Sequence, residues 1–564
     1  MNASNGSVRR DLLLLIGLSL LLLAAGIGLR NPWPADEPVY ALIARDMLAH
    51  HQWLIPMAGG DYYQDKPPLF FWLIAAGYFI TGSLKVGFLL PSLLAGLGTT
   101  LLVYDLGRRL WNREAGLYAA VLLLFTVQFT LQARRAQIDA VLMFWILLSL
   151  YCLLRQLLGG GGWRWCVAAG IAAGLGVLSK IVGFLSFMVL LPWIYAWWRG
   201  WQMPPAPRPW WLWVSGGVAC AAVAALWIVP VLLAAQADPA LVPYRDEVLL
   251  QQTFGRYTTP WHHVQPPWYY LQVIATAWMP LALLLPWLVP GWVRALRERD
   301  ARVLLIVGWA LLYVVFFSIS SGKRDVYILP ALPAVALAAG YLLPDLLRRR
   351  GPQRALFVLS ALVTVVCLGG AAWLSFGDTE RGSKLLGEAG LASFLPLAFI
   401  GAVGLVLMAA LRLQRSALAL LGIFMTAWLT LGFWVFPQMD TQRSARAFMA
   451  QLQSLADPQR ELGLLAYREQ FLWSVRRTTV NFGHRRFRDE AQEIDDAAHW
   501  LAQDPQRQLL VQEAMLEPCF RDTARRPAGR VSSINWYLVT GTPDAACAAR
   551  GNPASPLRYS PVLP

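Results

Sequence analysis

Charged residues are scarce in this chain. Only 14% of its 564 residues are Asp, Glu, Lys or Arg, against roughly 25% in ordinary soluble domains. Apolar residues make up 57%, and runs such as 12–29 and 211–235 approach or match the roughly 20 residues that cross a bilayer. This composition excludes a soluble enzyme, a disordered chain and a fibrous protein. It predicts a polytopic α-helical membrane protein.

Nucleotide-binding and nucleic-acid-binding signatures are also missing. The chain has no P-loop and no dinucleotide fingerprint, and we find no internal repeat and no interrupted helix pair of the transporter kind. The net charge of +15 comes mainly from short loops between apolar segments, where the positive-inside rule places basic residues. No basic cluster lies on a nucleic-acid-binding motif. The sequence therefore predicts no nucleic-acid partner, and anionic lipid headgroups or phosphorylated substrates fit the remaining charge better.

Cysteine is rare as well, with six residues in the chain. Cys519 and Cys547 alone fall outside the apolar segments. An exported domain would permit a disulfide between them, and two free thiols are the alternative. The other four are interpreted as small core hydrophobes: Cys152, Cys166, Cys220 and Cys367.

The apolar segments predict thirteen membrane crossings. Arg9 and Arg10 precede the first segment, which predicts a cytoplasmic N-terminus; a cleaved signal peptide is the alternative, but no convincing cleavage site follows Leu29. Segment 69–82 is short, and interpreting it as a half-span keeps the later basic loops inside and the tail outside. The predicted spans are 12–29, 86–104, 116–132, 139–157, 165–179, 181–199, 211–235, 268–292, 303–319, 328–346, 355–376, 394–412 and 416–437.

The sequence divides into an apolar part, 1–437, and a polar part, 438–564. The polar part is rich in Arg, Asp, Glu and Gln. It alternates a helix-like stretch, 495–503, with strand-like stretches at 508–512 and 536–539. These patterns predict a small soluble α/β domain outside the membrane.

The first external loop, 30–68, is the richest in unusual polar residues. After the pair Asp36-Glu37, apolar residues recur at amphipathic spacing, which predicts a helix on the membrane surface. The two acids have a structural interpretation too, as caps of that helix. The loop ends in DKPP, whose prolines hold Lys66 at the mouth of the next apolar segment.

Three further external elements carry polar residues on the same side. Carboxylates at membrane depth are costly and by default functional, while two basic pairs break the positive-inside rule and predict an anionic phosphate ligand. Both kinds of residue have an alternative interpretation. The lysines can be interface residues that extend toward the headgroups, and the histidine pair can be solvated and not a metal site. The residues are Arg134, Arg135 and Asp139; Arg256, His262 and His263 in the long loop 236–267; and Lys323, Arg324 and Tyr327 within 321–327.

Acids and cations together suit displacement at a sugar carbon that carries a phosphate leaving group. A carboxylate orients the nucleophile or acts as base, and cations stabilise the departing phosphate. Because nucleotide sugars are cytosolic, an external site predicts a lipid-linked donor whose phosphate lies at headgroup depth.

Four motifs resemble the bacterial lipid A aminoarabinose transferase family, which belongs to the GT-C membrane glycosyltransferases. The motifs are DEPVYALIARDML at 36–48, DYYQDKPPL at 61–69, QIDA at 137–140 and SGKRDVYILPALPA at 321–334. The resemblance covers most of the chain to about residue 440. It implies a GT-C fold with about thirteen transmembrane helices, a C-terminal periplasmic domain, and inverting transfer of 4-amino-4-deoxy-L-arabinose from undecaprenyl phosphate to lipid A at the inner membrane, with polymyxin resistance as a consequence.

The resemblance also assigns expected roles to residues. Asp36, Glu37 and Asp139 would be catalytic-site carboxylates, and Lys66, Lys323 and Tyr327 would hold phosphate. Charge placement adds Arg256. The full candidate substrate-binding set is Lys66, Tyr40, Tyr63, Arg135, Arg256, Lys323, Arg324 and Tyr327, and the candidate ligands for a possible divalent metal ion are Asp65, His262 and His263.

Two other functions remain open at the level of sequence. The first is a related transferase that uses protein hydroxyls or another glycan as acceptor. The second is a flippase for lipid-linked sugars, although acids clustered on one side of the membrane, and not at mid-span, argue against it. In each case the expected partners are membrane lipids and a lipid-linked sugar, and the chain is expected to be a monomer.

Overall fold

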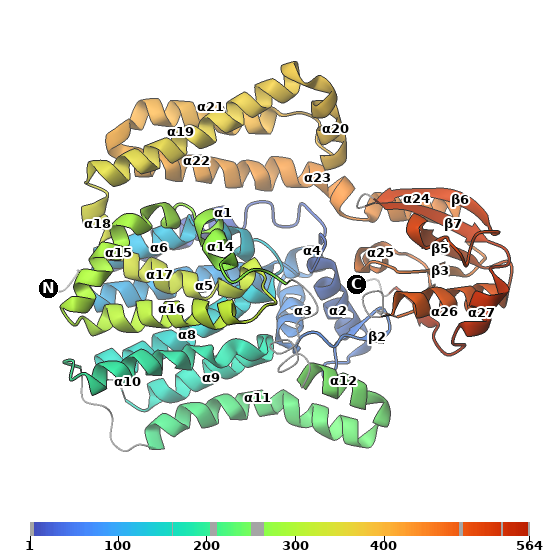
Figure 1. The fold of residues 1–564 in the computed structure, drawn as a ribbon, viewed down its shortest axis with the longest axis horizontal. Coiled ribbons are helices and arrows are strands. Elements are labelled where there is room, and N and C mark those ends of the chain that lie inside the picture. The colour runs from blue at the N-terminus through green and yellow to red at the C-terminus, as the bar shows by residue number, and fades with distance from the viewer. Residues whose placement is uncertain are drawn as a thin grey trace.

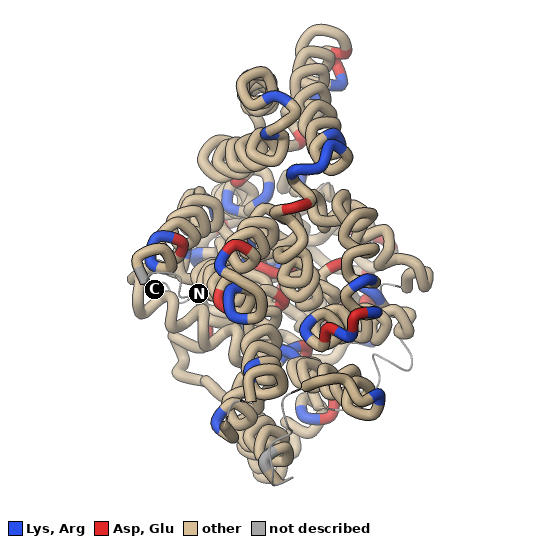
Figure 2. Tube along the Cα trace, turned by 90° about the vertical axis from the view of Figure 1, so that its left-hand side faces the viewer, with Lys and Arg blue, Asp and Glu red and all other residues tan. Residues whose placement is uncertain are grey.

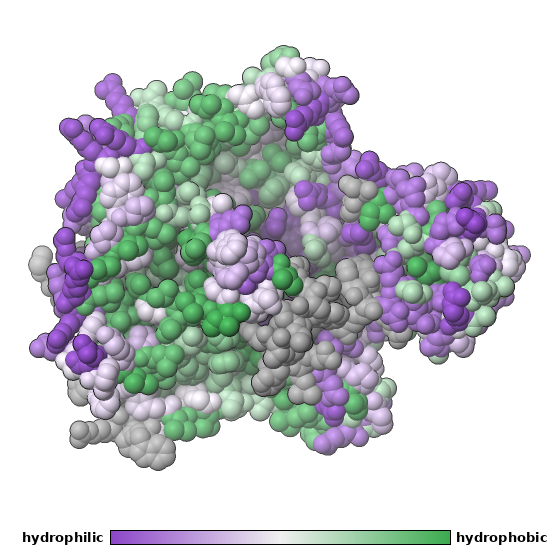
Figure 3. All heavy atoms as spheres, viewed as in Figure 1, coloured by the Kyte–Doolittle hydropathy of each residue, from purple (hydrophilic) through white to green (hydrophobic). Residues whose placement is uncertain are grey.

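The computed structural model describes residues 5–160, 162–203, 211–249, 264–483, 489–531 and 534–561. Long helices lie side by side along one direction, and a smaller domain of helices and strands lies at one end of them (Figure 1). The face seen in Figure 3 is largely apolar along the helices and hydrophilic at the two ends. Such a belt is the surface that a multi-pass membrane protein presents to lipid.

The central bundle is built from helices whose inner faces share one apolar core. Small residues bring these helices close together; a Cβ added at Gly340, for example, would lie 2.4 Å from the carbonyl oxygen of Ala115. The helices are α1 (Asn5–Leu23), α5 (Leu90–Leu110), α6 (Arg113–Leu124), α8 (Ile138–Gly159), α16 (Ala301–Ile319) and α17 (Ala331–Gly340).

Two groups of helices flank the central bundle, at the bottom and top of Figure 1. The lower group contains α9 (Arg164–Ser179), η1 (Ile181–Val189), α10 (Leu190–Trp198) and α11 (Trp211–Ala237). The upper group, which we call the arm, contains α19 (Arg350–Ala372), α20 (Thr379–Ala389), α21 (Leu395–Leu411) and α22 (Ser416–Thr430).

Seven helices in the described part of the chain are long and apolar enough to cross a membrane, or up to nine if each bent pair is one span. The predicted count of thirteen stays a prediction. Two of the predicted spans, 116–132 and 268–292, are bent in the structure: α6 and α7 (Val127–Ala133) meet at 69°, and α14 (Tyr269–Ala277) and α15 (Leu281–Arg297) meet at 109°. Extended backbone at Thr126 ends the first helix of the former pair.

Segment 69–82 forms α3 (Leu69–Thr81), a helix of 13 residues. At about 1.5 Å per residue it is too short for a hydrocarbon core of about 30 Å, in keeping with a half-span. It lies beside α2 (Glu37–His50), at the end of the bundle that faces the C-terminal domain (Figure 1). At the opposite end, Lys and Arg gather at many of the helix ends (Figure 2).

The C-terminal domain has a six-stranded mixed sheet of order β6-β7-β5-β3-β4-β8. The parallel strands β3 (Leu462–Leu464), β4 (Thr479–Asn481) and β5 (Gln508–Gln512) are buried almost throughout, as central parallel strands should be. Antiparallel strands complete it: β6 (Ala524–Val531), β7 (Ile534–Thr540) and β8 (Leu557–Tyr559).

The stretches predicted as helix and strands in the tail match α26 (Glu490–Ala502), β5 and β7. The division predicted between 437 and 438 falls inside α23 (Phe436–Arg443), because α22, η7 (Leu431–Val435), α23 and α24 (Arg446–Leu455) form one apolar helical run from the arm into the domain.

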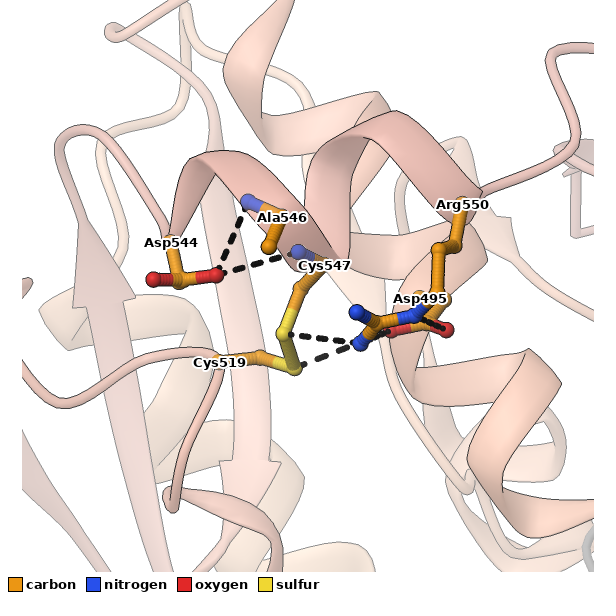
Figure 4. Close-up of a disulfide and its surroundings, with 6 residues drawn as sticks. All are labelled: Asp495, Cys519, Asp544, Ala546, Cys547 and Arg550. Carbon is orange, nitrogen blue, oxygen red and sulfur yellow. Dashed lines mark hydrogen bonds and ion pairs between the residues drawn. A yellow bond between two sulfur atoms is a disulfide. The ribbon is translucent and has the colours of Figure 1, made fainter.

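A disulfide joins Cys519 to Cys547 across a sequence separation of 28. Figure 4 shows how it is surrounded: Asp544 accepts hydrogen bonds from the backbone of α27 (Ala545–Arg550), and Arg550 reaches over the sulfurs to Asp495 at 2.7 Å. The free cysteines at 152, 166 and 367 are buried.

Helix α2 is not the surface helix that its amphipathic spacing predicted. Every residue from Glu37 to Met47 is buried, because α2 shares a core with α3 on one side and with the C-terminal domain on the other. On the domain side, Arg45 donates hydrogen bonds to the carbonyl oxygen of Leu472 at 2.9 Å and to the hydroxyl of Tyr559 at 2.6 Å. The Tyr559 hydroxyl donates in turn to Asp46 at 2.9 Å. The C-terminal domain thus holds the segment that carries the acidic pair.

Candidate active site

Asp36 lies at the start of α2 and faces groups from two distant segments. Its Oδ2 accepts a hydrogen bond from Gln137 Nε2 at 3.1 Å and pairs with an Arg324 nitrogen at 3.1 Å. Asp36 occupies the N-cap position of α2, but its side chain makes no capping hydrogen bond. Both printed contacts use Oδ2, and Asp36 also lines a cavity, so the carboxylate can reach a substrate.

Asp139 lies in the first turn of α8 and pairs with Lys180, Nζ to Oδ1, at 2.8 Å. The ammonium of Lys180 lies 4.3 Å from the centre of the Tyr327 ring, within the range of a cation–π contact. Lys180 was not among the predicted site residues. Its signal was nevertheless present, since it is a single charge between two apolar runs that become α9 and η1.

The Tyr40 hydroxyl lies within electrostatic range of several of these groups. Tyr40 is buried and packs on Phe70 and Phe71. Burial raises the pKa of Tyr40 well above its usual range, and the negative charges of Asp36, Asp139 and Asp65 raise it further, while Arg324 opposes them. Three carboxylates and a guanidinium therefore act on a single hydroxyl. We call Asp36, Asp139, Lys180 and Arg324 the central charge cluster.

Glu37, the neighbour of Asp36, has a different environment. It is 4% exposed and forms a two-point ion pair with Arg30, one contact of which is 2.7 Å. It also accepts hydrogen bonds from the backbone N–H groups of Trp33 and Ala136, at 2.9 and 3.1 Å. Its four hydrogen bonds all go to the protein, so Glu37 positions the loop around Asp36.

The two arginines at 134 and 135 differ in the same way. Arg134 is 7% exposed and donates to the carbonyl oxygens of Leu22 and Ala25, each at 2.8 Å, and of Trp428 at 3.0 Å. Burial, with a smaller effect of Arg30, lowers the pKa of Arg134 to about 10. The positive charge that sequence assigned to a phosphate is therefore matched by carbonyl oxygens at the C-terminal end of α1 and just before the junction of α22 with η7. Arg135 is exposed and lies beside Asp36 on the wall of a cavity.

The remaining predicted residues lie around this cluster. Lys323 is 3% exposed and donates to the carbonyl oxygen of Gln265 at 3.1 Å, and burial lowers its pKa. Lys66 is partly buried, and its ammonium donates to the carbonyl oxygen of Asp65 at 3.0 Å. Tyr63 is buried with its ring 5.8 Å from that of Phe71. Both motif lysines thus already bind backbone oxygens.

Arg256, His262 and His263 lie outside the described residues. Within the described ranges, one group of three side chains has the arrangement of a possible metal site, Asp495, Cys519 and Cys547. Both thiols of that group are consumed in the disulfide. Asp65 does not belong to it.

A small cavity of about 50 Å³ opens beside Asp36. It is lined by residues of three segments, 30–37, 131–137 and 428–443. These segments meet through small residues: a Cβ added at Gly432 would lie 2.6 Å from both the Ala25 carbonyl oxygen and a guanidinium nitrogen of Arg134. Asp36 therefore pairs with Arg324 within the central charge cluster and also lines this cavity.

Comparison with known proteins places these features in context. The dolichyl-phosphate-mannose-protein mannosyltransferase family matches residues 12–239. The undecaprenyl phosphate-α-4-amino-4-deoxy-L-arabinose arabinosyl transferase of Pseudomonas aeruginosa is 33% identical over 354 residues, which cover 58% of this chain and 60% of that protein. The corresponding transferase 2 of Sodalis glossinidius is 31% identical over 424 residues, which cover 70% of this chain and 72% of that protein. The alignment thus spans about 60% of the length of the Pseudomonas relatives.

Among solved structures, the crystal structure of ArnT from Cupriavidus metallidurans bound to undecaprenyl phosphate is similar over nearly the whole chain. The TM-score is 0.74 with 20% sequence identity, and the match covers 98% of this chain and 100% of that one. This likeness shows that the two chains share a fold.

Proposed function

This chain belongs to the undecaprenyl phosphate-α-4-amino-4-deoxy-L-arabinose arabinosyl transferase family, and we propose that it moves 4-amino-4-deoxy-L-arabinose from undecaprenyl phosphate to a phosphate of lipid A. Its fold is the GT-C fold that the motifs led us to expect. The observation that carries the proposal is the central charge cluster. Two acids and two cations from four separate segments converge at the end of the bundle beside the C-terminal domain.

The proposed reaction is a single displacement. An oxygen of the acceptor phosphate attacks the anomeric carbon of the sugar, and the bond from that carbon to undecaprenyl phosphate breaks. The electron pair of that bond leaves with undecaprenyl phosphate, and the configuration at the carbon inverts. Because a phosphate acceptor is already anionic, it needs little deprotonation. Asp36 then orients the sugar, whose amine is an attractive partner for a carboxylate.

The cations have the complementary task. Negative charge accumulates on the leaving undecaprenyl phosphate, and fixed cations beside it stabilise the transition state. Arg324 and Lys180 are each held by one acid, 3.1 Å from Asp36 and 2.8 Å from Asp139. In this proposal Asp139 positions Lys180, and Lys66 adds a charge at the mouth of the site.

We place the site on the periplasmic face of the bacterial inner membrane. Two observations support this orientation: the disulfide in the adjoining domain and the gathering of Lys and Arg at the opposite end (Figure 2). Since every group of the cluster comes from one chain, we also propose that the monomer is active.

The proposal is tested by mass spectrometry of lipid A after incubation with the purified protein and undecaprenyl-phosphate-linked aminoarabinose. The wild type is expected to add one pentosamine mass. Asp36→Asn keeps an oxygen for Gln137 but loses the charge, and is expected to lower the rate by roughly a hundredfold or more. Asp522→Asn, at an exposed acid of the C-terminal domain, is the matched control. No mass gain with folded wild-type protein would overturn the proposal.

A second candidate follows from the match of residues 12–239 to a protein mannosyltransferase family. It is transfer of a polyprenyl-linked sugar to a protein hydroxyl or to another glycan. A hydroxyl acceptor needs a base, so turnover would fall steeply at acid pH, whereas a phosphate acceptor of low pKa predicts a flatter profile. Replacing lipid A by a serine- and threonine-rich peptide in the same assay separates the two acceptors.

A further inference from the structure

Two arginines beside Asp36 carry charge that no described acid neutralises. Arg135 and Arg443 are exposed and line the same cavity as Asp36, and neither side chain forms an ion pair or hydrogen bond with any residue in the described ranges. Arg443 does contact the face of Trp33, at 6.0 Å. By contrast, the other two arginines of the wall, at 30 and 134, are buried and fully engaged. The lining of the cavity therefore has an excess of positive charge.

The walls that hold these two cations are built from partly buried contacts. Asp440 accepts hydrogen bonds from the backbone and side chain of Asn31, at 2.8 and 2.6 Å, and from the Trp33 indole at 2.8 Å. The Trp33 ring also meets the edge of Phe436 at 5.2 Å. Arg443 lies about one helical turn beyond Asp440 on α23. The hydrogen bonds of Asp440 therefore fix the position of the backbone from which the Arg443 side chain extends. Arg135 directly follows the carbonyl-bound Arg134.

The size and chemistry of the cavity select a small oxyanion. Its volume is about 50 Å³, a small space that suits a compact group better than a sugar ring. Paired guanidinium groups bind phosphate through parallel N–H donors. Trp33, Trp428 and Phe436 border the cavity, and aromatic residues of this kind lie at headgroup depth.

The surroundings indicate that the oxyanion belongs to a lipid. Figure 3 shows that the molecule is hollowed between the arm and the central bundle, with apolar walls, and that hydrophilic residues lie where this hollow approaches the C-terminal domain. The helical run from α22 to α24 passes this place on its way from the arm to the domain. Acyl chains in the hollow would leave their phosphate near the two arginines.

We propose that Arg135 and Arg443 form the acceptor site, in which they bind the phosphomonoester of an anionic glycolipid. This inference rests on the proposed function and adds the location of its second substrate. The donor phosphate lies on the Lys180 and Arg324 side of Asp36, and the acceptor phosphate lies on the cavity side. A non-bridging oxygen of the bound acceptor phosphate forms the new bond to the anomeric carbon as the donor phosphate departs with the electron pair of the broken bond.

The test combines binding with kinetics on the full-length protein in detergent. Binding of bis-phosphorylated lipid A and of dephosphorylated lipid A is measured by thermophoresis for the wild type, Arg135→Gln, Arg443→Gln and the double variant. Arg446→Gln, at an exposed arginine on the same helical run, is the matched control. The KM for lipid A and the KM for the donor are then measured separately, and inorganic phosphate is tested as a competitor.

Removing the phosphates from lipid A is expected to weaken binding to the wild type at least about tenfold, the equivalent of one lost charge-assisted contact, and to change little in the double variant. The double variant is expected to raise the KM for lipid A by a similar factor, with the donor KM unchanged. Competition by inorganic phosphate only at far higher concentration than lipid A supports a lipid headgroup as the ligand. Wild-type binding by the double variant, competition by phosphate as strong as that by lipid A, or a shift in donor KM alone would overturn the inference.

Failure of this inference and failure of the proposed function give different results. If the wild type transfers no sugar but binds phosphorylated lipid A through the two arginines, the acceptor site stands and the reaction does not. If transfer proceeds normally in the double variant, the reaction stands and the acceptor site is elsewhere.

Discussion

The contact between α2 and the C-terminal domain contains a buried acid, Asp46, whose replacement makes a quantitative prediction. Asp46 is 6% exposed. Burial raises its pKa to about 6, against opposing contributions from the Tyr559 hydrogen bond and from Arg45. An aspartate in an unfolded chain has a pKa near 3.9. The carboxylate is thus held in a place that favours its protonated form.

The sign and size of the effect follow from proton linkage. Because the folded pKa exceeds the unfolded one, the group contributes stability at low pH that is lost as pH rises through about 4 to 6. A difference of about two pKa units corresponds to roughly 3 kcal/mol. About 2 kcal/mol of this falls between pH 4.5 and 7.5, and the remainder lies below that range. Asp46→Asn removes the charge and keeps an oxygen for Tyr559, so it is expected to stabilise the protein at neutral pH.

The assay is thermal or denaturant unfolding of the detergent-solubilised protein across this pH range, with hydrogen exchange in β3 and β8 to report on the domain itself. The stability difference between Asp46→Asn and wild type should grow with pH by about 2 kcal/mol. Asp522→Asn, at an exposed acid of the same domain, should show no such growth. A variant that tracks the wild type at every pH, or a wild type that gains stability relative to the variant as pH rises, would refute this reasoning.

Three other substitutions have expected outcomes. Arg134→Met leaves three buried carbonyl oxygens without their donor and should cost about 3 kcal/mol or more in unfolding experiments. Lys180→Met leaves Asp139 unpaired and should lower turnover roughly a hundredfold, with Lys180→Arg recovering part of it. Cys519→Ser with Cys547→Ser opens a loop of separation 28 and should cost about 3.5 kcal/mol of domain stability on the chain-entropy account.

Each of these outcomes has a result that contradicts it. A wild-type melting temperature for the Arg134 variant would mean that water satisfies the three carbonyl groups. Full turnover in the Lys180 variant would remove that lysine from the proposed mechanism. As a control for the disulfide, the reduced wild type and the double-serine variant should unfold identically. An oxidised wild type that is no more stable than the double-serine variant would contradict the last prediction.

The two acids of the central charge cluster show most clearly what could be predicted from the sequence alone. Asp36 and Asp139 stood out because a carboxylate beside an apolar segment is costly unless it has a task. The structure gives them partners, Arg324 and Lys180, that lie 288 and 41 residues away along the chain. Spacing within a motif cannot reveal such pairs, since they are created by the packing of separate helices.

The errors have physical causes of the same kind. Arg134 broke the positive-inside rule and was therefore assigned to a phosphate, yet backbone carbonyl oxygens supply its counter-charge. The spacing of α2 predicted a surface helix because the chain gave no sign that the tail covers its polar side. Local strands and helices of the tail were predictable, since alternation and helical period are properties of adjacent residues.

The bond between Arg45 and Tyr559 spans 514 residues, which has a consequence for biogenesis. During synthesis, α2 is made long before the strand that completes its surroundings exists. The segment that carries Asp36 must wait, with Arg45 and Asp46 unsatisfied, until β8 arrives more than 500 residues later. Contacts of such separation form late in folding. The surroundings of α2 are therefore completed only after β8 has been made, and a chain that stopped before β8 would leave Arg45 and Asp46 without their Tyr559 contacts.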